Sequence, residues 1–411
     1  MFRAIDKWLA GYLSSVIRRP GNVQGTKHLM FCVADHFEPF WQKAPKERAV
    51  QIVARWAREF PAVAGKYHDA DGRTPQHTFF YPSEEYNEEC VAKLADICRR
   101  GFGEVEIHLH HRNDTKEGFR SSLEVFRDML RREHGLLGDW KVRPDPAKRW
   151  TCDAEILKGK EKKVAYGFIH GNWALCNSRP DGDWCGVNEE LGVLHQTGCY
   201  ADFTFPSAPS PTQPRMVNAI YRAVDTPGRP RACDQGKPVI SKQLSRLCSG
   251  SYAGQAVNSN QKSVKVGEST VHSPQSLMLI TGPLAFDWHR RKWGVFPRLE
   301  NGAITSSNPP SPGRIDLWTN QHIHIEGCPN WVFVKAYTHG CQQANADILL
   351  GNAMRKAYDH LLSSYNDGRQ WSLHFVTARE LYNIVRAAED GNTGNPGDYR
   401  DYEILPPPGK K

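Results

Sequence analysis

The hydrophobic pattern along the chain changes repeatedly between the period of a buried strand and the period of a helix. The first apolar run, HLMFCVAD at residues 28–35, predicts a strand. In residues 46–67 the positions Val50, Val53 and Trp56 follow helical spacing, which predicts a helix after this strand. Later apolar runs predict further strands at residues 78–82, 104–110, 162–173, 200–206, 276–284 and 331–340.

The helices between these strands carry start and stop signals. In residues 83–101, Ser83 is predicted to cap the helix, acidic residues fill the first turn, and Gly101 ends it. The same signals recur from Thr115 to Gly135. Because strands and helices alternate, the chain is predicted to be an α/β protein with parallel strands. Roughly seven or eight strands in succession favour a closed or nearly closed barrel over an open sheet.

Composition along the chain predicts one elaborated domain with two terminal extensions. Residues 28–390 contain the strand and helix pattern, and residues 1–27 have the pattern of an amphipathic helix. From residue 206 to 275 the chain is rich in Pro, Ser, Gly, Gln and Asn and has little periodicity, which predicts a loop-rich insertion. Residues 391–411 are predicted to form a C-terminal tail on the surface.

Overall composition narrows the class of protein. The chain has 411 residues, 39% hydrophobic and 24% charged, and it contains no apolar run near the roughly 18 residues that cross a bilayer. Its net charge of +8 is spread without a basic block, which argues against a nucleic-acid partner. The N-terminal segment lacks the apolar core and cleavage site of an export signal, so a cytoplasmic protein is expected. None of the 11 cysteines lies in a C-x-x-C pair, which argues against a zinc ribbon.

Metal-binding residue types gather where four predicted strands end. In parallel α/β proteins the carboxyl ends of the strands meet at one edge, and catalytic groups collect there. Imidazole nitrogen and carboxylate oxygen are ligands that Zn²⁺ and related ions take together. The sequence therefore predicts a divalent metal site, with zinc favoured and nickel, cobalt or iron as alternatives. The residues at the four strand ends are Asp35, His36 and Glu38; His108, His110, His111 and Asp114; His170 and Asn172; and His339.

Strand alternation narrows the ligand set and leaves alternatives. His108 and His110 point to the same side of a strand and can share a site, whereas His111 lies past the strand end and can turn inward, support a ligand or face solvent. Asp114 can fold back over the same centre. After the strand that ends at His170, substrate contact is predicted for two residues, Asn172 and Trp173.

Two other groups of residues are weaker candidates for a functional site. His322 and His324 also alternate, but no carboxylate stands at a matching strand end. The tryptophan-rich segment 287–296 either packs in the core, which is favoured, or lines a sugar-binding groove by stacking.

The strand-end motifs, in their order over roughly residues 28 to 345, resemble those of the polysaccharide deacetylases, the NodB-like group of carbohydrate esterases. In VADHFEP, Asp35 stands in the position of the family's catalytic base, and His36 stands where the family has a metal-binding aspartate. The segment EIHLH matches the family's histidine motif and puts His110 on one metal ligand. The other ligand stays open between Asp114, which has the family's spacing, and two histidines with the usual chemistry, His108 and His111.

The resemblance also implies roles for residues on later strands. His170 lies in the region of the family's arginine, and AYTH places His339 at the general acid. The implied fold is a distorted (β/α)₇ barrel, and the implied reaction is metal-dependent removal of N- or O-acetyl groups from a polysaccharide or glycan. In that reaction Asp35 takes a proton from metal-activated water, His339 protonates the leaving group, and His170 steadies Asp35 or the oxyanion.

Two alternatives compete with this interpretation. One is a metal-dependent glycoside hydrolase of related barrel type, which needs a second carboxylate across the sugar; Glu38 and Asp202 are the candidates. The other is a barrel without catalytic activity that binds a glycan or a partner protein, which the histidine at position 36 favours slightly.

Overall fold

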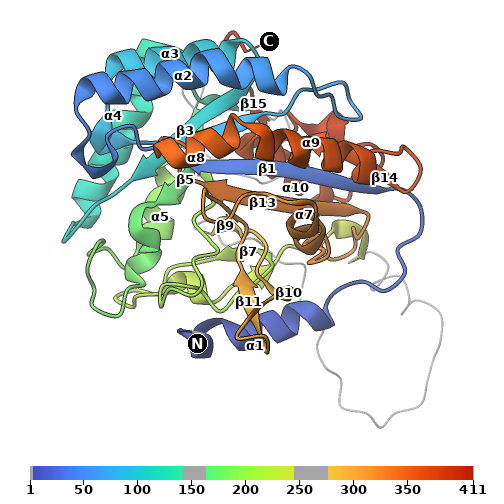
Figure 1. Cartoon of the computed structure of the whole chain (residues 1–411). Coiled ribbons are helices and arrows are strands. Elements are labelled where there is room, and N and C mark those ends of the chain that lie inside the picture. The colour runs from blue at the N-terminus through green and yellow to red at the C-terminus, as the bar shows by residue number, and fades with distance from the viewer. Residues whose placement is uncertain (1–2, 142–162, 245–275, 411) are drawn as a thin grey trace.

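The computed structural model describes residues 3–141, 163–244 and 276–410, so part of the predicted insertion, 245–275, lies outside the described residues. Its centre is a 13-stranded, mostly parallel sheet flanked by helices, which confirms the predicted α/β class (Figure 1). Neighbouring strands follow the order β12 (Ala303–Ile304), β13 (Trp331–Thr338), β1 (Lys27–His36), β2 (His77–Pro82), β3 (Gly103–Leu109), β5 (Val164–His170), β6 (Cys199–Asp202), β9 (Leu277–Ile280), β7 (Ile220–Ala223) and β8 (Lys237–Pro238). Within the described ranges, no strand pairing joins β12 to β8.

Three short strands extend this sheet at its amino-terminal edge. The strand β14 (Trp371–Phe375) runs parallel to the first half of β1, which leaves only the second half of β1 to pair with β2. The strands β4 (Gly138–Trp140) and β15 (Ile404–Leu405) add antiparallel pairs next to β5. The pairing register sets Asp35 opposite Thr338 and Pro82 opposite His108, so the carboxyl ends of β1, β13, β2 and β3 share one edge.

Helices connect most of the parallel strands. Thr115 caps one of them by accepting a hydrogen bond from the N–H of Gly118, and Gly135 ends the same helix in a left-handed conformation, as the sequence predicts. No helix within the described residues is both long enough and apolar enough to cross a membrane. The helices are α1 (Ile5–Ile17), α2 (Lys46–Ala64), α3 (Glu88–Arg99), α4 (Lys116–His134), α5 (Glu190–Thr197), α7 (Pro312–Thr319), α8 (Gln343–Leu349), α9 (Asn352–Tyr365) and α10 (Ala378–Glu389).

Alternate residues of β1 pack against two different layers. Phe31 and Val33 belong to the core shared with α2, α3 and the other helices on the outer face of the sheet. Cys32 and Ala34 belong to a second core, in which α10 covers the opposite face. Because side chains alternate along a strand, this pattern continues to the strand end and sends Asp35 and His36 to opposite faces.

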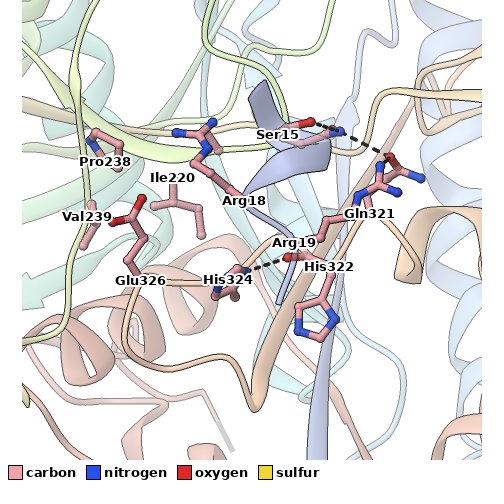
Figure 2. A pocket seen from close by; sticks show the side chains of 12 residues that line it. Ser15, Arg18, Arg19, Ile220, Pro238, Val239, Gln321, His322, His324 and Glu326 are labelled. Atoms are coloured by element: carbon pink, nitrogen blue, oxygen red, sulfur yellow. Dashed lines mark hydrogen bonds between the residues drawn. The ribbon is translucent and has the colours of Figure 1, made fainter. Parts of the chain in front are cut away.

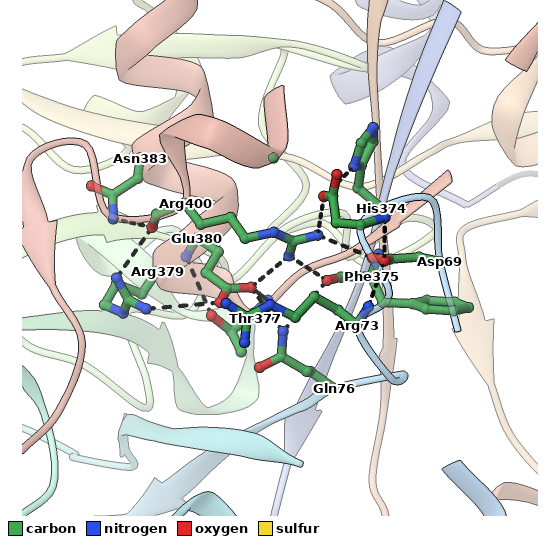
Figure 3. A network of polar contacts seen from close by, with 12 residues as sticks. Asp69, Arg73, Gln76, His374, Phe375, Thr377, Arg379, Glu380, Asn383 and Arg400 are labelled. Atoms are coloured by element: carbon green, nitrogen blue, oxygen red, sulfur yellow. Dashed lines mark hydrogen bonds and ion pairs between the residues drawn. The ribbon is translucent and has the colours of Figure 1, made fainter. Parts of the chain in front are cut away.

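All residues of α10 are buried, and its charged side chains form a buried network of ion pairs (Figure 3). Thr377 and Glu380 form a capping box at its first turn. Arg379 binds the carboxylate of Glu104 on β3 at 2.8 Å, and Arg400 binds that of Asp69 at 3.0 Å. Charged side chains are tolerated at this depth only because they are paired and hydrogen-bonded.

The predicted start of one helix is wrong by four residues. Ser83 begins a short 3₁₀ turn, Ser83–Glu85, and α3 starts at Glu88 after Asn87, whose side chain accepts the N–H of Cys90 at 3.2 Å. Asn87 satisfies the cap as well as a serine does, so the polar residues before it are free to form the turn. This turn directs Glu84 toward the strand ends.

Segments predicted without regular structure contain several elements. The described part of the insertion includes β7 and β8, and the segment 287–296 lies in a hairpin of β10 (Ala285–Lys292) and β11 (Phe296–Glu300). Within this hairpin Trp288 is 57% exposed and Trp293 78% exposed, so core packing, the favoured role, is wrong for these two side chains. In the C-terminal tail Arg400 and Glu403 are buried, so the tail is partly built into the core rather than lying only on the surface.

Candidate metal centre

Five side chains converge at the carboxyl ends of β1, β3 and β13, and we call them the inner cluster: His36, Glu38, His108, His110 and His339. They form two triads that share Glu38, one with His36 and His339 and one with His108 and His110. Within each triad the candidate ligand atoms lie within 4.8 Å of one another. The structure thus brings together three predicted metal ligands, His36, His108 and His110, and the predicted general acid, His339.

Strand geometry explains why these residues meet. His36 is the last residue of β1 and shares its face with Ala34, whereas His339 follows β13, the neighbour of β1. Their rings stack with centroids 4.7 Å apart. His108 on β3 and His110, just after the end of β3, point to the same side as predicted, with ring centroids 4.5 Å apart.

Hydrogen bonds fix the orientation of two imidazoles. Nδ1 of His108 lies 2.8 Å from the carbonyl oxygen of Ile169, and Nδ1 of His110 lies 2.5 Å from Oε1 of Glu84. Since both partners are acceptors, each Nδ1 carries the proton and each Nε2 presents a lone pair to the cluster. A metal-binding histidine is held in this way by a carbonyl or carboxylate on its other nitrogen.

The lone pairs of these imidazoles face another acceptor. Oε1 of Glu38 lies 3.1 Å from Nε2 of His108 and 3.6 Å from Nε2 of His110. Oε2 of Glu38 is buried and has no hydrogen-bond partner in the described structure. Converging acceptors without a donor repel one another unless a cation or a proton lies between them. The inner cluster therefore fits a divalent metal, with nitrogen and oxygen donors of the kind that zinc, nickel, cobalt and iron accept.

Burial keeps three imidazoles of the cluster in the neutral form that binds metal, whereas the pKa shifts of Glu38 and His110 favour their protonated forms. Desolvation lowers the pKa of His36, of His339 and of His108, the last to about 3, so these rings are neutral at neutral pH. Desolvation also raises the pKa of Glu38. For His110, burial lowers the pKa but the Glu84 carboxylate outweighs it, and the net pKa is raised. Neutral imidazoles can donate their lone pairs directly to a metal.

A second group of four buried side chains lies on the other side of β3, and we call it the outer cluster: His111, His170, Cys185 and Glu190. Their candidate ligand atoms also lie within 4.8 Å of one another. His170, predicted as a catalytic residue, belongs to this cluster. Asp114, predicted as a metal ligand beside His110, instead binds Nδ1 of His111 at 3.1 Å.

Asp35, the predicted base, lies apart from the inner cluster on the outer face of β1. Its Oδ2 lies 2.7 Å from Nε2 of His77, and its Oδ1 accepts the N–H of Gly340 at 2.6 Å. Trp56 covers this pair on the outer side: its ring packs against His77 at a tilt, with centroids 4.7 Å apart, and its indole N–H donates to the Gly340 carbonyl at 3.0 Å. Both oxygens of Asp35 therefore hold the ends of β1, β2 and β13 together.

The Asp35→Asn variant tests this placement. Asparagine can accept the Gly340 N–H and donate to Nε2 of His77 after the ring changes tautomer, so we expect full metal content and a fall in kcat of less than about tenfold. Metal analysis and steady-state kinetics of the acetate release that the motif resemblance implies provide the measurement. A loss of more than about 100-fold at full metal content, of the size a general base contributes, would instead assign the base to Asp35.

The remaining predicted site residues lie around the clusters rather than within them. Asn172 is exposed, and Trp173 is partly buried with an indole N–H that has no partner among the described residues. Both follow His170 in a short 3₁₀ turn, Gly171–Trp173. Asp202 is buried and its side chain bonds Thr204, at 2.7 Å to the hydroxyl.

The rival histidine pair lies in a different part of the molecule. His322 and His324 line a small pocket beside the end of α1, together with Arg18, Arg19 and Glu326 (Figure 2). His324 binds the carbonyl oxygen of His322 through Nδ1 at 2.8 Å. The arginines at the same pocket disfavour a cation there.

Two residues of the outer cluster and one supporting residue were missed in the sequence. Cys185 lies in a loop, and Glu190 is the first residue of α5, where an acid is usual for helix reasons alone. Glu84 is one of two acids in the turn before α3. No local spacing marks any of them, because each meets its histidine only through the fold.

Comparison with known proteins adds no identification. No protein-family model matches the sequence, and a search of curated proteins finds no significant relative. Function is therefore inferred from the geometry of the clusters and from the motif resemblance.

Proposed function

We propose that the chain is a metal-dependent hydrolase that removes acyl groups, acetyl groups in particular, from a polysaccharide or glycan. The observation that carries this proposal is the inner cluster, in which the Nε2 atoms of His108 and His110 converge on the buried Glu38 carboxylate, whose Oε2 has no hydrogen-bond partner among the described residues. Its position at the carboxyl edge of parallel strands is the usual place for catalysis in such folds. The resemblance to polysaccharide deacetylases supplies the substrate class.

The proposal includes a distorted (β/α)₇ arrangement of β13, β1, β2, β3, β5, β6 and β9. Two contacts between the ends of this series support it. Lys335 on β13 donates to the carbonyl oxygens of Phe203 and, at 2.5 Å, of Phe205, which follow β6. Gly282, just after β9, donates to the Phe205 carbonyl at 3.0 Å and lies so close to the Lys335 carbonyl that no side chain fits between them.

Within the inner cluster, His36, His108, His110 and Glu38 are the residues that would hold the metal, and His339 is kept for proton transfer. When bound, the metal lowers the pKa of a coordinated water and polarises the acyl carbonyl.

Supporting and proton-transfer roles fall to this chain's own residues. The Ile169 carbonyl and the Glu84 carboxylate keep Nε2 of His108 and His110 directed inward. Oε2 of Glu38, which has no other partner among the described residues, accepts the proton of the attacking water. The proton taken up by Glu38 passes to His339, which is neutral at rest, and from His339 to the departing amine or alcohol. Asp35 acts as a positioning residue through the backbone of Gly340, next to His339.

No observation favours the two alternative functions over this one. The glycoside hydrolase needs a second carboxylate facing Glu38, but Asp202 is occupied by Thr204 and has Lys335 as its charged neighbour. A barrel that only binds a glycan offers no reason for a cluster of unsatisfied acceptors around a buried carboxylate.

The proposal is tested by metal content and acyl release on the same samples. Purified protein, stripped with a chelator and reloaded with Zn²⁺, Ni²⁺, Co²⁺ or Fe²⁺, should release acetate from acetylated chitin oligosaccharides or acetylated xylan without producing new reducing ends. His110→Ala should lower metal affinity and kcat/KM together, by more than the roughly 10–100-fold lost when only a residue supporting a ligand is removed.

The matched control is His322→Ala, which removes a partly buried histidine outside both clusters. It should keep the metal affinity and acetate release of the wild type. Reloaded wild type that releases no acetate from either substrate, or His110→Ala with full activity, would refute the proposed hydrolase.

A further inference from the structure

The outer cluster repeats the arrangement of converging acceptors seen in the inner cluster. Nδ1 of His111 lies 3.1 Å from the Asp114 carboxylate, and Nδ1 of His170 lies 2.6 Å from the Gly171 carbonyl oxygen. Since both partners are acceptors, both Nδ1 atoms carry protons and both Nε2 atoms present lone pairs. These two Nε2 atoms lie only 2.8 Å apart.

A carboxylate points at the same spot. Oε1 of Glu190 lies 2.9 Å from Nε2 of His111 and 3.3 Å from Nε2 of His170. Its other oxygen, Oε2, accepts the N–H of Cys176 at 2.5 Å, which fixes the direction of Oε1. Three acceptors therefore meet in a buried space with no donor among them, an arrangement that is stable only around a cation or a trapped proton.

Cys185 completes a set of four donors. Its free thiol is buried, and its sulfur lies within 4.8 Å of the ligand atoms of the other three residues. Two imidazole nitrogens, one sulfur and one carboxylate oxygen are all donors that zinc binds, and four donors are its usual number in structural sites. All four residues are buried, so the set is closed to substrate, as in structural rather than catalytic zinc sites.

We propose that the outer cluster is a second metal centre, a closed structural zinc site that holds the loops behind the inner cluster. Its four ligands come from four segments: His111 from the loop after β3, His170 from the end of β5, Cys185 from the loop before α5, and Glu190 from the first turn of α5. A backbone hydrogen bond of 2.9 Å from Asp114 to the carbonyl of Cys185 already joins two of these segments. Zinc adds crosslinks between parts of the chain up to 79 residues apart.

The position of Gly171 links this site to the inner cluster. Gly171 packs against the ring of His110 so closely that any side chain at position 171 would collide with it. The same Gly171 supplies the carbonyl that holds His170. The zinc site thus fixes the surface on which His110 rests, while His110 and His111, adjacent in sequence, belong to different clusters.

The test uses Co²⁺ as a spectroscopic probe, because a cysteine thiolate bound to Co²⁺ gives an intense sulfur-to-metal charge-transfer absorption in the near ultraviolet. Cobalt-loaded wild type should show this absorption, and Cys185→Ser should lose it together with about one bound metal per chain. The matched control is Cys199→Ser, which removes another buried free thiol with the same contact, 3.3 Å to the carbonyl oxygen two residues on. This control and His110→Ala should keep the absorption.

A measurement without any variant covers the case in which Cys185→Ser does not fold. X-ray absorption of the zinc-loaded wild type should show a sulfur neighbour at about 2.3 Å beside nitrogen and oxygen neighbours at about 2.0–2.2 Å. Absence of sulfur from the zinc shell, or an unchanged cobalt spectrum in folded Cys185→Ser, would overturn the proposal. Neither readout depends on acyl release, so a failure of the proposed hydrolase is seen separately.

Discussion

Replacing Glu38 by glutamine should lower kcat for acyl release by about 10²–10⁴-fold, the range that a general acid–base group contributes, and should also weaken metal binding. Glutamine fills the same volume but carries no charge for a metal and no site for the proton of water. In the metal-free protein, by contrast, the same substitution should stabilise the fold. Its amide can donate to Nε2 of His108, which now faces an acceptor at 3.1 Å, so a gain of about 1–3 kcal/mol is expected.

This gain should grow with pH. Burial raises the pKa of Glu38 in the folded state above its value in the unfolded chain. An acid with a raised folded pKa costs stability once the pH exceeds the unfolded pKa, and this cost increases up to the folded pKa. Scanning calorimetry of metal-free wild type and Glu38→Gln from pH 4 to pH 8 therefore measures how their difference in stability changes with pH.

Glu124→Gln, on the solvent-facing side of α4, is the control for the change from glutamate to glutamine. It should leave metal content, kcat and the pH dependence of stability as in the wild type. If Glu38→Gln releases acetate at the wild-type rate, Glu38 is not the base that accepts the proton of water. If the metal-free variant unfolds more easily than the wild type, the Glu38 carboxylate is not repelled by the imidazoles around it.

Replacing Arg379 by methionine should destabilise the fold by about 3–5 kcal/mol, the usual result of removing one partner of a buried ion pair. The guanidinium of Arg379 binds Glu104 at 2.8 Å and also donates to the Ile404 carbonyl at 2.8 Å. Without it, Glu104 keeps only Thr377 and Lys410 as partners among the described residues. Urea denaturation followed by circular dichroism gives the free energy of unfolding.

Arg58→Met, at an exposed position of α2, should change the free energy of unfolding by no more than about 0.5 kcal/mol. Adding Glu104→Gln to Arg379→Met should recover part of the lost stability, because the buried carboxylate that has lost its guanidinium partner is then removed as well. A loss of less than about 1 kcal/mol in Arg379→Met would show that the network contributes little.

Much of the sheet could be predicted from the sequence because each predicted strand is a short apolar run that ends in polar or turn-forming residues. The helix from Thr115 to Gly135 was found for the same local reason, since its cap and its end depend on the residues themselves. The pairing of β14 with β1 and the burial of α10 could not be found in this way. Both depend on contacts between parts of the chain more than 300 residues apart.

The same distinction between local signals and long-range contacts applies to the candidate site. Strand alternation correctly predicted that His108 and His110 share a side, because that requires only the period of a strand. The resemblance led to Asp35 as the base, but the structure places it on the face of Val33, away from His36. Which acceptors face one another at Glu38 and Glu190 depends on hydrogen bonds that histidine Nδ1 atoms donate to Ile169, Glu84 and Asp114, and no pattern of residue types predicts these bonds.

The burial of α10 affects the synthesis of the protein. The inner face of β1 packs against α10, which begins roughly 340 residues after β1 ends, at residue 378 against residue 36. At about 5–20 residues per second, a ribosome needs on the order of 20–70 s to make that stretch. Throughout this time Met30, Cys32 and Ala34 form an apolar surface on the nascent chain without their final covering. A chain released before α10 is complete would present this surface to other chains, so chaperones that hold apolar segments are the natural partners of its biosynthesis.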